Sequence, residues 1–334
     1  MINRWIVITS VYVPRTEIID QLSIGYSIVV VGDLKTPHDL WKEINRPNFY
    51  YLSPDEQDFH FPELSKAIGF GTYARKNIGY LFAIMNGAQS IWDTDDDTYI
   101  RDGAIAQLND ISSCQQYMVV GNGYFNPYIF FTNDTKMWPR GYPLRLVSAD
   151  KLILSKDLDI KSDGSLKSID ILQTLVNLEP DVDAIYRMTV GDSKTDFEID
   201  NRVIHLDKGV FAPGNTQSTL WINPAKLQYL YIPRWVSFRF CDILKMYIAQ
   251  SRVNFSYAGF WSEQVRNPHD YMVDFESEVS CYLNTESVVK LLSEVQSDSL
   301  SDIYQMLYTN EICNAQEVET AMIFEDLIKR LQNG

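Results

Sequence analysis

The sequence predicts an α/β fold: a mostly parallel, Rossmann-like sheet flanked by helices, with a helical extension at the C-terminal end. Strand-like and helix-like segments alternate over the first 120 residues. The strand-like segments are short, apolar and β-branched, which is typical of strands buried on both faces. From residue 285 onward the pattern becomes that of amphipathic helices. Alternation of short buried strands with helices indicates parallel βαβ units.

Five segments of the N-terminal part are expected to follow one another as strand, strand, helix, helix and strand. The β-branched run 4–13 is the first strand, and the continuous apolar run 26–31 is a strand buried on both faces. A short helix is expected over 38–44, after a proline. A longer helix is predicted over 72–87, where apolar residues recur near helical spacing and a glycine ends the pattern. The strand 89–92 then leads into a cluster of acids.

The rest of the chain is interpreted from composition and periodicity. Residues 121–215 are rich in Pro, Gly and Tyr, which predicts irregular strands and long loops. A helix is expected over 235–250. Three amphipathic stretches predict the extension: 285–296, 299–308 and 315–332. We therefore expect an α/β domain over 1–284 and an acidic helical extension over 285–334.

Composition and charge exclude several classes of protein. Of the 334 residues, 46% are apolar and 22% are charged, as in a folded globular chain and unlike a disordered one. The formal net charge of −15 and the pI of about 4.7 argue against a broad basic surface, so we expect no nucleic-acid partner. Residues 270–334 carry −10 of this charge, and the remainder carries only −5.

The sequence also suggests a compartment. No apolar run approaches the length of a membrane span, and the first residues lead directly into a strand rather than a signal peptide. The four cysteines are scattered and contain no C-x-x-C pair, which fits neither a zinc knuckle nor a disulfide framework. We expect reduced thiols in a cytoplasmic protein without an integral membrane segment.

The strongest motif is the acidic run DTDDD at 93–97. Four carboxylates in five residues repel one another unless a cation neutralises them, and Mn²⁺ or Mg²⁺ with oxygen ligands does so. A D-x-D pair can hold such a metal on a diphosphate, where it acts as a Lewis acid on the departing group. A solvated acidic turn or a structural calcium loop is the alternative. The run follows a predicted strand of a parallel sheet, where ligands bind, and this position favours the functional interpretation.

Other candidate residues are defined by their positions beside predicted elements. Asp33 follows the second strand, at a ligand-binding strand end. Arg75 and Lys76 lie in the first turn of a predicted helix and form either an anion site or two exposed charges. Asp242 precedes a helix and is either an N-cap or a general base for an acceptor hydroxyl. His269 could complete a metal site with the aspartates, or be a surface residue.

A further motif match is attributed to chance. The segment Gly69–Ala74 fits the dinucleotide fingerprint G-x-G-x-x-A, but no buried strand is predicted before it, so the required context is missing. The sequence contains no P-loop, no G-x-S-x-G turn and no H-x-x-x-H pair.

Six blocks of the sequence, in the same order, resemble the STELLO family of glycosyltransferases, and the similarity extends to about residue 295. The blocks are VVVGDLKTP (29–37), ARKNIGYLFAIMNGAQSIWDTDD (74–96), WPRGYPL (138–144), LVNLEPDVDAIYRMT (175–189), VSFRFCDILKMYIAQ (236–250) and RNPHDYMVDFESE (266–278). A more distant similarity is to the reversibly glycosylated polypeptides, the UDP-arabinopyranose mutases, which share an Asp triplet and a G-Y-P loop. Both resemblances imply a GT-A fold that binds a nucleotide sugar with a divalent cation.

The resemblance also implies roles for individual residues. Two registers of the metal motif are possible, Asp93-x-Asp95 and Asp95-x-Asp97, and Asp95 belongs to both. We assign Mn²⁺ or Mg²⁺ to Asp95, Asp97 and His269, and the acidic residue near the acceptor to Asp242. The residues expected to bind the nucleotide sugar are Asp33, Arg75, Lys76, Asp93, Asp96 and Arg140.

The predicted function is metal-dependent transfer of a sugar from a nucleotide-sugar donor, expected to be a UDP sugar, to a glycan or other hydroxyl acceptor. One alternative is a UDP-sugar mutase that interconverts pyranose and furanose forms. Another is a non-catalytic scaffold that retains the GT-A fold.

Overall fold

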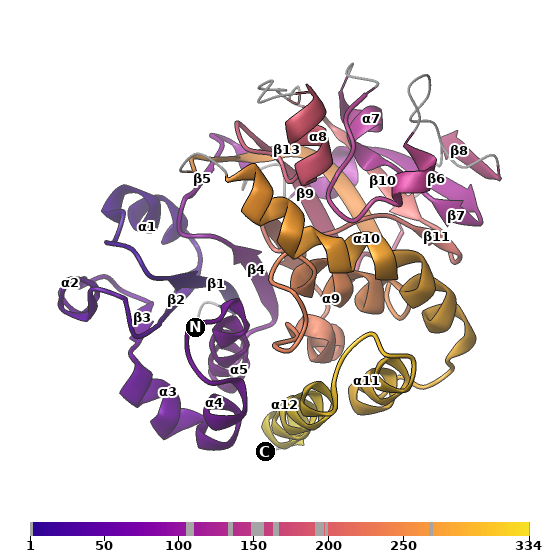
Figure 1. Cartoon of the computed structure of the whole chain (residues 1–334). Helices are drawn as coiled ribbons and strands as arrows, with labels where there is room; N and C mark the ends of the chain where they lie inside the picture. Colours follow the sequence, from indigo (N-terminus) through magenta and orange to yellow (C-terminus); the bar gives the residue numbers. More distant parts are fainter. Residues whose placement is uncertain are drawn as a thin grey trace. The chain divides into compact units, whose positions relative to one another are not determined.

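The computed structural model describes most of the chain and shows two compact units. Described are residues 3–104, 110–132, 136–147, 157–162, 167–190, 197, 200–266 and 270–333. Unit 1 comprises Met1–Thr98, Leu220–Val236 and Ser297–Gly334, and unit 2 comprises Tyr99–Thr219 and Ser237–Gln296. Both units combine helices with strands, so the predicted α/β class is confirmed (Figure 1).

Unit 1 is built around parallel strands in the order β3-β2-β1-β4 (Figure 1). These are β1 (Arg4–Ser10), β2 (Ser27–Gly32), β3 (Phe49–Leu52) and β4 (Ser90–Thr94). The pairing of β1 with β2 runs from Trp5↔Ser27 to Ser10↔Gly32. Every residue of β2 is buried, as the continuous apolar run predicts for a strand covered on both faces.

Helices pack closely on this sheet. Those of the N-terminal part are α1 (Thr16–Leu22), α2 (His38–Lys42), α3 (Pro54–His60), α4 (Pro62–Ile68), the 3₁₀ turn η1 (Tyr73–Arg75) and α5 (Lys76–Met85). A Cβ atom at Gly79 of α5 would lie 2.6 Å from Val7 Cγ1 and 2.8 Å from Val31 Cγ2. Glycine at this position therefore allows α5 to approach β1 and β2.

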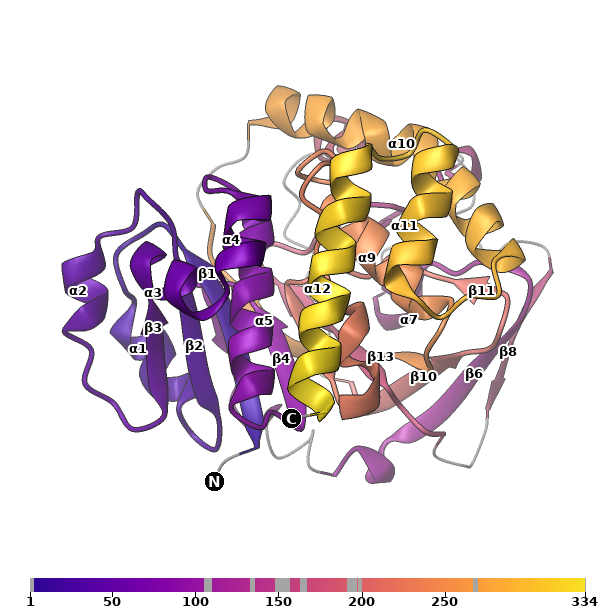
Figure 2. The same cartoon turned by 90° about the horizontal axis from the view of Figure 1, so that it is seen from below.

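The last two helices of the chain belong to unit 1. They are α11 (Leu300–Thr309) and α12 (Ala315–Asn333), and α12 packs against α4, α5 and α11 (Figure 2). Tyr231, which follows the 3₁₀ helix η4 (Pro224–Leu230), is buried with its ring 5.3 Å from that of Tyr304 and 5.2 Å from that of Phe324. These helices are therefore part of the core of unit 1.

Unit 2 contains a mixed sheet with the order β9-β13-β10-β6-β8. The strands are β6 (Gln115–Gly121), β8 (Leu158–Ser162), β9 (Ile171–Asn177), β10 (Arg202–Leu206) and β13 (Phe255–Gln264), and β7 (Gly123–Tyr124) pairs with β11 (Val210–Phe211). The helices are α7 (Pro127–Phe131), α8 (Ala184–Val190), α9 (Cys241–Gln250) and α10 (Tyr271–Glu294), with 3₁₀ turns η2 (Ile111–Ser113) and η3 (Leu144–Leu146). Helix α10 packs against α8 and α9. Two short strands, β5 (Thr98–Ile100) and β12 (Ser218–Trp221), contain two of the four points where the chain passes from one unit to the other.

Several boundaries differ from those predicted. The first strand ends at Ser10 rather than at residue 13, because Val11, Tyr12 and Val13 leave the strand and are exposed. Strand β9 lies in the region where irregular structure was expected, and all of its seven residues are buried. The polar residues Gln173 and Thr174 interrupt the apolar pattern by which a buried strand is recognised. Both are buried, and both donate hydrogen bonds to the Ser218 carbonyl, at 3.1 and 3.2 Å.

The two compact units do not coincide with the predicted domains 1–284 and 285–334. Helix α10 begins at Tyr271 and lies in unit 2, whereas α11 and α12 lie in unit 1. Among the described residues, none of the helices combines the length and the apolar character needed to span a bilayer.

Candidate functional site

The carboxyl ends of three strands of unit 1 form a polar edge. Ser10 ends β1, Asp33 follows β2, and the acids 93–97 begin in the last residues of β4. The Thr36 hydroxyl donates to the Ser10 carbonyl at 2.7 Å, and the Ser10 hydroxyl donates to Asp96. The structure thus brings Asp33 and the acidic run to the same edge, as the strand-end positions predict.

Asp33 is tied to the loop that precedes α5. Its carboxylate accepts hydrogen bonds from the backbone N–H of Gly71 at 2.8 and 3.0 Å and from that of Leu34 at 2.6 Å. Gly71 has a φ of +72°, a conformation that favours glycine. The glycine-rich segment follows helix α4, so the strand required by the dinucleotide fingerprint is indeed missing. In this structure Asp33 holds the loop in place.

Lys76 lies among the oxygens of the acidic run. Its ammonium nitrogen is 2.7 Å from Asp93 Oδ1, 3.6 Å from Asp95 Oδ1, and donates to the Thr94 carbonyl at 2.6 Å and to the Tyr73 hydroxyl at 2.9 Å. The side chains of Lys76 and Asp93 are both completely buried. A charged pair survives such burial only when its members compensate each other, as these do.

Two tyrosines extend this cluster. The Tyr80 hydroxyl donates to Asp93 Oδ2 at 2.6 Å, and the Tyr73 hydroxyl donates to Asp95 Oδ1 at 2.9 Å. Burial and the charge of Asp93 raise the pKa of Tyr80 well above its ordinary value, so its hydroxyl remains a donor. Asp93 therefore has an ammonium and a hydroxyl as partners, whereas the side chain of Asp95 is 18% exposed.

The remaining acids of the run are partly exposed. Burial raises the pKa of the Asp96 carboxyl, against the opposing effect of the bond from Ser10. Asp97 is also partly exposed. Across the described residues, no three or more His, Cys, Asp and Glu side chains are grouped so as to hold a metal ion. His269, the predicted third ligand, lies outside the described residues.

Arg75 is buried and faces away from the acidic run. Its guanidinium donates to the Gln57 side chain at 2.8 Å, to the Ser65 hydroxyl at 2.9 Å and to the carbonyls of Ser65 and Gly69 at 3.2 and 3.3 Å. It also stacks over the Phe70 ring at 4.1 Å. Burial lowers its pKa to about 10, despite the opposing charge of Asp33. These contacts favour a structural role over donor binding.

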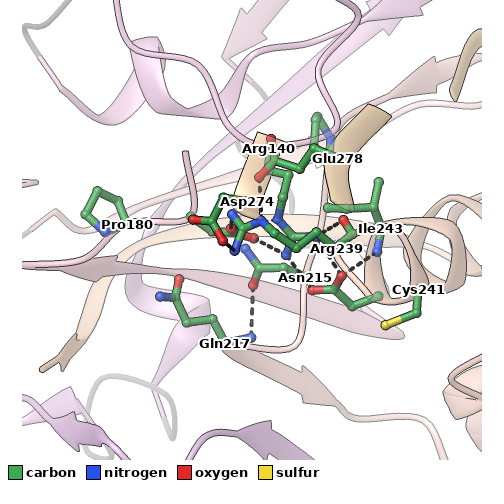
Figure 3. A network of polar contacts seen from close by, with 12 residues as sticks. Arg140, Pro180, Asn215, Gln217, Arg239, Cys241, Ile243, Asp274 and Glu278 are labelled. Carbon is green, nitrogen blue, oxygen red and sulfur yellow. Dashed lines mark hydrogen bonds and ion pairs between the residues drawn. The ribbon is translucent and has the colours of Figure 1, made fainter. Parts of the chain in front are cut away.

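Unit 2 contains a separate network of buried charges (Figure 3). Arg140 donates to both oxygens of Asp242 at 2.8 and 2.7 Å and to both oxygens of Asp181 at 2.9 and 2.7 Å. Burial alone would lower the pKa of Arg140, but the two carboxylates outweigh it and raise the pKa well above its ordinary value. Burial would likewise raise the pKa of Asp181, but Arg140 lowers it to about 2.

A second arginine extends the network. The Arg239 guanidinium donates to Glu278 at 2.5 Å and lies 3.8 Å from Asp181 and 3.6 Å from Asp274 (Figure 3). Glu278 is completely buried and also accepts from the Ala184 backbone N–H at 2.8 Å. The network therefore joins α8, α9 and α10 to the loops around residues 140 and 181.

The network bears on two of the sequence predictions. Arg140 was expected to bind the donor, but its guanidinium holds Asp181 and Asp242. Asp242 lies in the first turn of α9, whose N-cap residue is Phe240, so it is not the cap. Both of its oxygens accept bonds from Arg140, but each carboxylate oxygen has two lone-pair sites, so these bonds do not by themselves prevent Asp242 from accepting a proton.

Sequence reasoning did not single out Asp181, Arg239, Glu278, Tyr73 or Tyr80. Asp181, Arg239 and Glu278 lie within the matched blocks 175–189, 236–250 and 266–278. These residues could have been found as charged residues flanked by apolar ones within a matched block. Such neighbours indicate burial, and a buried charge requires a partner.

Comparison with known proteins gives two relatives with curated names. The chain is 28% identical over 310 residues to "Probable glycosyltransferase STELLO2" of Arabidopsis thaliana, which covers 87% of this chain and 39% of the relative. It is 26% identical over 319 residues to "Probable glycosyltransferase STELLO1" of the same plant, with coverages of 90% and 40%. The chain thus spans about two fifths of the length of these relatives.

The other comparisons add less. No family model matches the chain. Solved structures of S. aureus TarS 1-349, with UDP-GlcNAc and without it, are 11% identical with TM-scores of 0.37 and 0.36, and the match covers 99% of this chain and 92% of TarS. A likeness this weak supports no statement about site or ligand. The resemblance to the STELLO proteins predicted from six sequence blocks is thus confirmed over most of the chain.

Proposed function

We propose that the chain is a glycosyltransferase domain that takes a sugar from a nucleotide-sugar donor, a UDP sugar, and transfers it to a glycan or other hydroxyl acceptor. The observation that carries the proposal is similarity over 87% and 90% of the chain to two proteins named as glycosyltransferases. The polar edge of unit 1 supports it, because ligands of parallel α/β sheets bind beyond the carboxyl ends of the strands.

The residues of this edge fit a divalent cation in one register better than in the other. Asp93 is completely buried and already paired with Lys76, whereas Asp95 and Asp97 are partly exposed. Mg²⁺ is commonly held by one or two carboxylates together with substrate phosphates. We therefore propose Asp95 and Asp97 as the ligands of Mn²⁺ or Mg²⁺, with His269 a predicted further ligand. A cation there would act as a Lewis acid toward the departing nucleoside diphosphate.

The other residues of the edge orient these ligands. Asp33 holds the loop before α5, and Tyr73 fixes one oxygen of Asp95. Lys76 compensates part of the negative charge of the run before any substrate binds. Asp242 remains the proposed residue near the acceptor. It would orient the acceptor hydroxyl and accept its proton on Oδ2, which keeps a lone-pair site beside its bond from Arg140.

The test is a screen of the full chain against UDP, GDP and dTDP sugars with MnCl₂ or with EDTA. Nucleotide binding is followed by thermal shift, release of nucleoside diphosphate by a coupled assay, and sugar products by mass spectrometry. We expect stabilisation and turnover with a UDP sugar only when the metal is present. Asp95→Asn should abolish both, whereas the exposed Asp39→Asn of α2 should change neither.

Three outcomes would contradict the proposal. Conversion of UDP-arabinopyranose to its furanose form without an acceptor would identify a mutase instead. Failure to bind any nucleotide of the panel with Mn²⁺ would favour a scaffold. Full activity in EDTA would remove the role of the metal.

A further inference from the structure

We infer that the Lys76 ammonium is a built-in cation of the Asp93-x-Asp95 pair, and that it thereby restricts a bound divalent cation to the Asp95-x-Asp97 pair. Lys76 is in this view a positioning residue that acts through the two aspartates. The first part depends only on contacts within unit 1. The second part rests on the proposed function.

The ammonium fills the position between the two carboxylates. Its nitrogen lies 2.7 Å from Asp93 Oδ1 and 3.6 Å from Asp95 Oδ1, so one positive charge serves both acids. An ammonium has three N–H donors. Two hydrogen bonds, to the Thr94 carbonyl at 2.6 Å and to the Tyr73 hydroxyl at 2.9 Å, hold the ammonium in place, and its contact with Asp93 Oδ1 at 2.7 Å is an ion pair.

Burial makes this arrangement hard to displace. The side chains of Lys76 and Asp93 are completely buried, and an isolated charge there would be far more costly than a paired one. A divalent ion bound to Asp93 would either expel the ammonium from its buried position or lie within a few ångströms of a like charge. Asp93 is therefore closed to a metal while Lys76 is present.

Asp95 differs from Asp93 in its burial and in its contact with the Lys76 ammonium. Its side chain is 18% exposed, its contact with the ammonium is longer, and its hydrogen bond comes from the neutral Tyr73 hydroxyl. The same Tyr73 oxygen accepts a bond from Lys76. Lys76 and Tyr73 together hold Asp95 in a fixed orientation while leaving its side chain partly exposed.

The first experiment removes the built-in cation. Lys76→Met keeps a chain of similar length without the charge and should lower the thermal midpoint, because Asp93 loses its partner. If Lys76 stands in for a cation, millimolar MnCl₂ should restore part of this loss and should bind at least about tenfold more tightly than to the unmodified chain, a change of the size that ligand surroundings produce. Binding is measured by the Mn²⁺ electron paramagnetic resonance signal without nucleotide.

Two control variants distinguish the role of Lys76 as a cation from a purely structural effect of its replacement. Lys76→Met combined with Asp93→Asn removes both charges, so the stability should recover without metal and the gain in Mn²⁺ affinity should vanish. Tyr80→Phe removes a hydrogen-bond donor to Asp93 but leaves the ammonium, and should gain no Mn²⁺-dependent stabilisation. Equal rescue of Tyr80→Phe, or no rescue of Lys76→Met, would overturn the inference.

The second experiment tests the register with MnCl₂ and UDP. We expect Asp93→Asn to keep the Mn²⁺ affinity, and Asp95→Asn and Asp97→Asn each to lose about tenfold or more. An equal loss in Asp93→Asn would show that Asp93 is a ligand. If the unmodified chain binds no Mn²⁺ with UDP but Lys76→Met gains a site that depends on Asp93, the proposed function loses its metal while the role of Lys76 stands.

Discussion

Arg140 and Asp242, 102 positions apart in the sequence, form a two-bond ion pair inside unit 2, with N···O distances of 2.8 and 2.7 Å. The same guanidinium holds Asp181 at 2.9 and 2.7 Å. One arginine thus compensates two buried carboxylates, and the second nearby arginine, Arg239, lies 3.8 Å from Asp181. The network stabilises unit 2 only as long as its charges are matched, which makes it directly testable.

Replacing Arg140 should strongly destabilise unit 2. We expect Arg140→Met to cost about 3–5 kcal/mol in the free energy of unfolding, because buried Asp242 loses both of its bonds from Arg140 and buried Asp181 loses its two shortest arginine contacts. Arg145→Met is the control, since Arg145 pairs with Glu286 on the surface, where loss costs at most about 1 kcal/mol. Urea unfolding followed by circular dichroism measures both. Similar small losses in the two variants would mean that the network is not stabilising.

The depressed pKa of Asp181 predicts sensitivity to acid. Its ordinary pKa of 3.8 falls to about 2 in the folded chain. A carboxyl with a lowered pKa stabilises the fold above its unfolded pKa, and this contribution is lost as the pH falls from about 4 to about 2. Asp181→Asn should be less stable at pH 6 but should lose less stability over that range. Urea unfolding at a series of pH values would show this; parallel curves would contradict it.

Glu317 should have the opposite dependence on pH. Burial raises its pKa from 4.5 to about 7, against the hydrogen bond from Tyr231. The folded chain keeps a proton that the unfolded chain has lost, so stability is full below pH 4.5 and falls by up to about 3 kcal/mol as the pH rises to 7. Glu317→Gln should flatten this slope, whereas the exposed Glu319→Gln should not. A slope that persists in Glu317→Gln would assign the titration to another group.

Gly79 should not tolerate a methyl group. Alanine is the better helix former, but its Cβ would lie 2.6 Å from Val7 and 2.8 Å from Val31, so we expect Gly79→Ala to cost about 1–3 kcal/mol through overpacking. Combining it with Val7→Ala should recover part of that loss, and a double-mutant cycle measures the coupling. Strict additivity of the two changes would show that α5 moves aside instead.

Local patterns predicted much of unit 1. The run YSIVVV covers five of the six residues of β2, all of which are buried, and the segment 72–87 contains η1 and α5. Continuous apolar runs and helical spacing are properties of neighbouring residues, so the sequence displays them directly. Irregular strands were expected over 121–215, but the position of the regular, buried strand β9 was not predicted, because its buried Gln173 and Thr174 obtain their partners from residues about 45 positions away.

The site was predicted in its location and less well in its roles. Strand-end positions placed Asp33 and the acids 93–97 at one edge before any contact was known, and the structure brings them there. The roles of Arg75 and Arg140 as donor-binding residues stay predictions, and their buried partners favour structural ones. A charge on a helix or loop looks the same in sequence whether it faces solvent or a buried acid.

By itself the sequence determined the α/β class, three of the four parallel strands of unit 1, the strand-end cluster and the resemblance to the STELLO proteins. Each of these depends on local periodicity or on the order of short blocks. Only the tertiary structure decided which acids are neutralised by a nearby basic side chain. Lys76 forms an ion pair with Asp93, and Arg140 forms ion pairs with Asp181 and Asp242. The physical reason is that the cost of a buried charge is set by its partners in space, and folding alone brings those partners together.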